Sequence, residues 1–162
     1  MKKYLKALLL LLLLQSCKKT AEQPVVAYPD IVVGTLQNGS YTVTNVKEIQ
    51  QEWEKAILHT GTGIKKLESF TIVKGKTQGD AVNDFYMLSA RTTDGKTTMA
   101  ALLVQKEHNF YFDKINPVSV ICTGECTNGC LPAALLKNGT VYLICGACAS
   151  CVKTDVSLNF PE

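Results

Sequence analysis

The sequence predicts an α+β domain in which one amphipathic helix packs on a curved antiparallel sheet, followed by a cysteine-rich C-terminal region. Three observations predict it. One stretch, residues 46–58, carries apolar side chains at helical spacing. Runs of alternating or β-rich residues, separated by turn residues, occupy most of the remaining chain. Six cysteines then fall between positions 122 and 151.

The first predicted element is a β-hairpin in residues 31–44. Asn38-Gly39 lies between two β-rich runs, and this dipeptide favours the tight turns that join antiparallel strands. Asn138-Gly139 is interpreted as a turn in the same way, although both sites also match the glycosylation triplet.

The helix is expected to begin after Asn45, with Glu48 as the partner of a capping box, and to end before Gly61. Its apolar stripe consists of Val46, Ile49, Trp53, Ile57 and Leu58. Trp53 lies in the middle of this stripe, so we expect it to anchor the core rather than to bind a ligand.

Six or more short strands, which lie on both sides of the helix in the sequence, are expected to form one sheet. Asp94-Gly95 predicts a second hairpin within residues 84–106. The other strand-like runs are residues 66–76, 109–113, 116–122, 139–145 and 151–160.

The first seventeen residues indicate where the protein resides. Lys2, Lys3 and Lys6 precede an apolar run, Ala7 to Leu14, which is shorter than the about 20 residues of a membrane-spanning helix but suits a secretory signal. The following residues, Leu14-Gln15-Ser16-Cys17, resemble the lipobox of bacterial lipoproteins. No family resemblance is evident for the rest of the chain.

The lipobox resemblance implies cleavage before Cys17, a diacylglyceryl thioether on its sulfur and a fatty acyl group such as palmitate on its new amine. It divides the chain into a signal peptide (1–16), a lipidated tether (17–29) and a single α+β domain (30–162) that contains the cysteine-rich segment 122–151. The expected location is the cell envelope. Lys18 after the lipid cysteine favours the outer membrane by analogy with enteric lipoproteins.

Charge limits the expected partners. The net charge of +3 belongs entirely to the lysines of the signal, so 14 basic and 14 acidic residues remain after cleavage. A neutral domain whose single arginine is Arg91 lacks the basic surface that binds nucleic acid. The expected partners are the lipid bilayer and an unidentified envelope component.

Motifs of catalysis are missing from the sequence. It holds two histidines and neither a glycine-rich phosphate loop, a G-x-S-x-G turn nor an H-E-x-x-H helix. We therefore expect a protein that is not an enzyme and has no cofactor other than the lipid on Cys17.

The cysteine count supports disulfides. Of seven cysteines, Cys17 carries lipid, which leaves an even set of six in two triplets. An exported protein meets an oxidising environment, so three disulfides are expected. If the strands that end at Cys122 and Cys145 lie near each other, the two triplets face one another and bridges between them are favoured. Six cysteines allow 15 pairings, and the sequence does not choose among them. The six are Cys122, Cys126, Cys130, Cys145, Cys148 and Cys151.

Two alternatives use the same residues. Cys145-x-x-Cys148-x-x-Cys151 resembles the start of the ferredoxin run, so the six cysteines could instead hold a metal or an iron–sulfur cluster in an electron-carrier lipoprotein. A redox enzyme using Cys145-x-x-Cys148 is the third alternative, which is disfavoured because this run follows a strand and contains a third cysteine. The favoured function is a non-enzymatic binding, adhesion or structural module at the envelope, stabilised by three disulfides.

Overall fold

The computed structural model describes residues 30–61, 63, 66–127, 129–146 and 148–158. The predicted signal peptide, Cys17 and the tether lie outside these residues. The described part is α+β but largely β, with most strands antiparallel. Its elements are β1 (Gly34–Gln37), β2 (Ser40–Val43), α2 (Val46–His59), β3 (Leu67–Lys76), β4 (Gln78–Gly79), β5 (Asp84–Thr92), β6 (Thr97–Lys106), β7 (Asn109–Phe112), β8 (Val118–Thr123), β9 (Pro132–Lys137), β10 (Thr140–Cys145) and β11 (Val152–Ser157).

Strand β6 is the centre of an eight-stranded sheet. One of its edges pairs with β5, which in turn pairs with β3. The other edge is shared, because β8 pairs with its first half and β7 with its second half. β11 continues the sheet beyond β8, and β1 with β2 continues it beyond β7. All these pairs are antiparallel.

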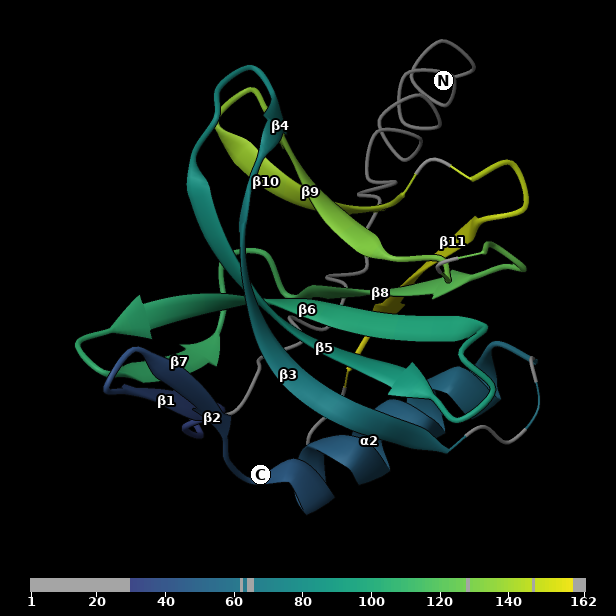
Figure 1. Cartoon of the computed structure of the whole chain (residues 1–162), viewed down its shortest axis with the longest axis horizontal. Helices are drawn as coiled ribbons and strands as arrows, with labels where there is room; N and C mark the ends of the chain where they lie inside the picture. Colours follow the sequence, from purple (N-terminus) through teal and green to yellow (C-terminus); the bar gives the residue numbers. More distant parts are fainter. Residues whose placement is uncertain (1–29, 62, 64–65, 128, 147, 159–162) are drawn as a thin grey trace, which may run out of the picture.

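A separate three-stranded sheet has the order β10–β9–β4. β9 and β10 form a hairpin, and β4 adds to β9 in parallel. β4 belongs to the long excursion between β3 and β5, which reaches from the large sheet to the small one (Figure 1). Asp80 strengthens this junction: its N–H donates to the carbonyl of Leu136 (3.0 Å), and its carboxylate accepts from the N–H of Asn138 (2.6 Å).

Helix α2 covers one face of the large sheet and the small sheet covers the opposite face, which gives three layers (Figure 1). Ile49, Trp53 and Ile57 are the buried residues of the helix. Burial on both faces explains why β6 has buried side chains at successive positions rather than at alternate ones.

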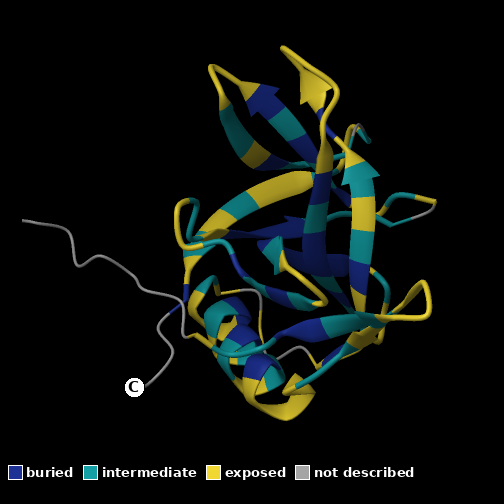
Figure 2. Ribbon diagram, turned by 90° about the vertical axis from the view of Figure 1, so that its left-hand side faces the viewer, coloured by how far each residue is buried: buried dark blue, intermediate teal, exposed yellow. Residues whose placement is uncertain are grey.

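Two hydrophobic cores result, one on each face. Figure 2 shows buried residues along the central strands and the inward side of the helix, with exposed residues at the tips of the hairpins. In β6, Met99, Ala101 and Leu103 belong to the helix-side core, whereas Ala100 and Leu102 belong to the core between the sheets. The second core also contains Cys122 and Cys130.

Two details of the predicted helix are wrong. Asn45 precedes the helix as expected, but it adopts a left-handed conformation (φ 54°) and its side chain makes no capping bond. Its amide donates to the carbonyl of Val32 instead (3.0 Å). The apolar stripe is also narrower than expected, since Val46 and Leu58 are exposed. Trp53 is a fully buried core residue, as predicted.

The strand prediction is correct for most of the large sheet and incomplete for the small one. Turns at Asn38-Gly39 and Asn138-Gly139 join antiparallel strands, with positive φ at all four residues. A single sheet was expected, but there are two, and β4 and β9 were not predicted. β9 lies in the stretch interpreted as part of the cysteine loop.

Candidate functional site

The two cysteine triplets are joined in order, first to first, second to second and third to third. The three disulfides are Cys122–Cys145, Cys126–Cys148 and Cys130–Cys151, with Cα atoms 5.6, 6.1 and 5.5 Å apart. These separations fall within the usual range for disulfides. The segments 122–130 and 145–151 therefore run side by side, and three cross-links connect them.

Glycines allow the two segments to approach this closely. A side-chain carbon at Gly124 would lie 2.6 Å from the carbonyl oxygen of Ser150 and 3.0 Å from the Cα of Cys151. Gly146 donates its N–H to the carbonyl of Leu131 (2.7 Å). Gly129 has a positive φ (77°) and closes a turn on the carbonyl of Cys126 (2.8 Å).

The first disulfide connects the two sheets. Cys122 lies on β8 in the large sheet, and Cys145 ends β10 in the small sheet. Side chains two residues apart on a strand share a face. Val118 and Val120 therefore share the face of Cys122, and Val141 and Leu143 share the face of Cys145.

These two rows of side chains form the walls of an apolar cleft between the sheets, of about 360 Å³. This volume is within the range of small-molecule sites. Its floor includes Leu102 of β6, and its rim includes the exposed Ile115 and Tyr142. The full lining is Leu102, Ile115, Asn116, Pro117, Val118, Val120, Val141, Tyr142, Leu143, Lys153 and Asp155.

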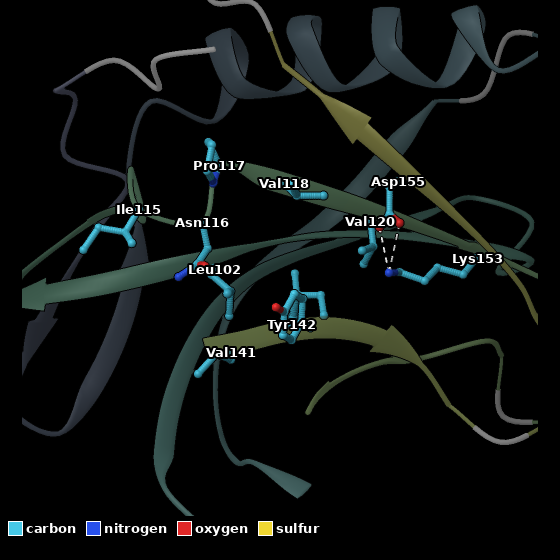
Figure 3. A pocket seen from close by; sticks show the side chains of 11 residues that line it. Leu102, Ile115, Asn116, Pro117, Val118, Val120, Val141, Tyr142, Lys153 and Asp155 are labelled. Atoms are coloured by element: carbon cyan, nitrogen blue, oxygen red, sulfur yellow. Dashed lines mark hydrogen bonds and ion pairs between the residues drawn. The ribbon is translucent and has the colours of Figure 1, made fainter. Parts of the chain in front are cut away.

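The cleft has an apolar end and a charged end. Figure 3 shows Ile115 on one side and the Lys153–Asp155 pair on the other, with the valines and Tyr142 between them. The ammonium nitrogen of Lys153 lies 2.8 Å from one carboxylate oxygen of Asp155 and 3.1 Å from the other. Both residues lie on β11, opposite Cys122 and Val120 of β8.

The described chain begins close to the apolar end of the cleft. The carboxylate of Asp30 lies 2.7 Å from the ammonium of Lys114, the residue before Ile115. This hydrogen bond and the positive charge of Lys114 lower the pKa of Asp30 from its usual value. The first described residue, Asp30, therefore lies next to the rim.

The six sulfurs form one compact group. The sulfurs of Cys122, Cys130 and Cys145 lie within 4.8 Å of one another, and so do those of Cys126, Cys130 and Cys151. Cys130 belongs to both sets. A soft metal would need these sulfurs as thiolates, whereas the three bridges engage all six, so the two states exclude each other.

The cysteine prediction and the structure agree that the triplets are cross-linked to each other. Cys145 and Cys148, the pair of the redox alternative, are not bonded to each other, because each pairs with a cysteine of the first triplet. The predicted lipid site, Cys17, lies outside the described residues. The cleft was not predicted. Its apolar residues alternate along their strands in the same way as residues of an ordinary core, and they remain accessible only because the two sheets are spaced apart here.

Searches of protein-family models, of curated protein sequences and of solved structures each find no match to this chain. Among the described residues, no helix is both long enough and apolar enough to cross a membrane.

Proposed function

We propose that this chain is a lipid-anchored protein of the cell envelope that is not an enzyme. Its domain binds a small amphiphile in the cleft. The observation that carries the proposal is the apolar cleft itself, whose facing walls are joined by Cys122–Cys145. A cross-link between the walls keeps the site formed in the absence of ligand, which lowers the cost of ordering on binding.

The chemistry of the lining specifies an amphiphile. An alkyl or ring portion would remove the side chains of Val118, Val141 and Ile115 from water, which favours binding by about 25 cal/mol for each Å² buried. Lys153 and Asp155 form the one ion pair of the lining. A charged head group of the ligand would bind at this end by replacing one member of the ion pair. An anionic head group would pair with the ammonium of Lys153.

Position supports an envelope ligand. The tether of thirteen residues, 17–29, would span at most about 45 Å when fully extended. Because Asp30 is held beside Ile115, a lipid on Cys17 would keep the apolar end of the cleft within that distance of the bilayer. Amphiphiles from the bilayer or the surrounding envelope would then be the ligands encountered most often.

Binding is tested with a fluorescent anionic amphiphile, 1-anilinonaphthalene-8-sulfonate, displaced by dodecanoate. Ile115 is 90% exposed, so Ile115→Asp leaves the fold intact but places a charge at the apolar end, and we expect binding to weaken by about tenfold or more. The matched control is Val82→Asp, since Val82 is 70% exposed and does not line the cleft. Equal affinity in both variants would contradict the proposal.

The anchor is tested separately. Cys17→Ala removes the proposed acylation site, and we expect the variant to lose both the acyl groups and the cleavage before residue 17. Mass spectrometry of the purified wild-type protein should show an N-terminal Cys17 carrying acyl groups. An unmodified chain beginning at Met1 would contradict the anchor without affecting the cleft.

A further inference from the structure

The three disulfides differ in how accessible they are. In Cys126–Cys148 both cysteines are partly exposed, whereas each of the other two bridges joins a buried cysteine, Cys122 or Cys130, to a partly exposed one. Cys126 also lines a polar hollow of about 720 Å³, together with Arg91, Lys96 and Glu125. The hollow also contains Asp94, so its lining has two basic and two acidic side chains, and a small thiol that enters it can reach the sulfur of Cys126.

Cys148, the disulfide partner of Cys126, is positioned to be the leaving thiolate in thiol–disulfide exchange. The hydroxyl oxygen of Ser150 lies 3.2 Å from the sulfur of Cys148 and 3.9 Å from that of Cys126. A hydroxyl that donates to a sulfur stabilises the thiolate formed there, and a stabilised thiolate leaves faster in thiol–disulfide exchange. Attack on Cys126 with departure of Cys148 is therefore the favoured first step.

The sulfurs of the Cys130–Cys151 disulfide lie close to both of the other bridges. The sulfur of Cys151 lies within 4.8 Å of that of Cys126, and the sulfur of Cys130 lies within 4.8 Å of those of Cys122 and Cys145. Small side-chain rotations would bring such pairs to reacting distance. Cys130 is thus the only described sulfur that belongs to both groups.

A hydroxyl group beside Cys122 could donate a hydrogen bond to a thiolate formed there. Thr98 of β6 is the register partner of Cys122, and its hydroxyl is buried without a hydrogen-bond partner among the described residues. An unpaired buried hydroxyl is costly. Donation to a thiolate at Cys122 would satisfy it.

We propose that the cysteine segment is a thiol–disulfide exchange site that accepts electrons from a dithiol at Cys126–Cys148 and passes them through Cys130 to Cys122–Cys145. A thiolate of the dithiol attacks the sulfur of Cys126 and releases Cys148. The second thiol of the dithiol then closes its own disulfide and releases Cys126. The dithiol is oxidised by two electrons and one protein disulfide is reduced.

The remaining steps exchange bonds without further oxidation or reduction. The Cys126 thiolate attacks Cys151, which forms Cys126–Cys151 and releases Cys130. The Cys130 thiolate attacks Cys122–Cys145, bonds to one of these sulfurs and releases the other. Two disulfides and two thiols result, and the bond between the sheets is broken. Loss of the Cys122–Cys145 disulfide would weaken amphiphile binding, a consequence that rests on the proposed function.

The exchange is tested on the full oxidised protein without any amphiphile, so its outcome is independent of the cleft. The protein is treated with one equivalent of dithiothreitol, quenched with acid at successive times, alkylated and mapped by peptide mass spectrometry. We expect Cys148 to be alkylated first, followed by Cys122 or Cys145, together with the new bridge Cys126–Cys151. Intermediates that keep only native bridges would overturn the proposal.

Two variants locate the first step. Ser150→Ala removes the hydroxyl beside Cys148, and we expect alkylation of Cys148 to become about threefold to tenfold slower. Ser40→Ala is the matched control, because Ser40 is an exposed serine on β2. Equal rates in the two variants would overturn the assigned direction of attack.

Discussion

Cys122 on β8 and Cys145 on β10 are bonded across the two sheets, and each continues the row of side chains that lines one wall of the cleft. The same bond thus closes the core between the sheets and sets the distance between the walls. Stability and binding should depend on it in separable ways.

Removing this disulfide should reduce both properties. The bond closes a loop with a sequence separation of 23, and a loop of this size contributes about 3 kcal/mol to the free energy of unfolding in the chain-entropy model. The double variant Cys122→Ala/Cys145→Ala should lose about that amount in urea denaturation and should also bind the amphiphile more weakly.

The matched control is Cys126→Ala/Cys148→Ala, whose disulfide has a sequence separation of 22. It should lose a similar free energy of unfolding because the loop is of similar size. Its affinity for the amphiphile should stay near that of the wild type, since neither cysteine lines the cleft. Equal losses of affinity in both double variants would show that the Cys122–Cys145 disulfide has no particular role in amphiphile binding.

Gly124 should tolerate no side chain. In Gly124→Ala the new methyl group would press on the backbone at Ser150 and Cys151, and overpacking of this kind costs about 1–3 kcal/mol. Urea denaturation of the oxidised protein measures the loss. The neighbouring variant Glu125→Ala, which removes only an exposed ion pair with Lys96, should differ little from the wild type.

Trp53 should contribute more to stability than any exposed residue of its helix. Trp53→Ala removes the largest fully buried side chain and should lower the free energy of unfolding by about 3–5 kcal/mol. Leu58→Ala, at a position on α2 that is 49% exposed, should change it by less than about 0.5 kcal/mol. Similar losses in both variants would contradict the helix-side core.

Asp84 should make stability depend on acidity. Its hydrogen bonds to Lys76 and then Lys74 lower its pKa in the folded state, so its contribution is complete above the unfolded pKa of about 3.9 and is lost as the pH falls through the lower folded pKa. The difference in unfolding free energy between wild type and Asp84→Asn should be small, constant from about pH 7 to pH 5, and smaller below about pH 4.

High salt provides the control for this pair. All three side chains are partly exposed, so 1 M salt should screen the interaction and reduce the difference at neutral pH. A difference that grows as the pH falls would mean that Asp84 is not stabilised by the lysines.

Local signals in the sequence predicted most of the large sheet. Asn38-Gly39 specifies a hairpin through backbone conformations that few other residues adopt, and Trp53 marks the buried side of the helix by its spacing. The linking of one triplet to the other also followed from the sequence, because Cys122 and Cys145 end apolar strands.

The small sheet and the cleft depend on long-range contacts that no local pattern records. β9 has the sequence Pro-Ala-Ala-Leu-Leu-Lys, which lacks β-branched residues, and β4 is two residues long. They pair at Gln78 with Leu135 and at Gly79 with Leu136, and these partners are far apart in the sequence. The order of the disulfides likewise follows from the parallel course of the two segments.

Mapping the disulfides of the purified, unreduced protein tests the central claim most directly. Trypsin should release residues 115–137 and 138–153 as one cross-linked species, and stepwise partial reduction with alkylation should assign its bonds. The account predicts Cys122–Cys145, Cys126–Cys148 and Cys130–Cys151. A bond within one triplet, or cysteines that react only after a chelator has removed a metal, would contradict it.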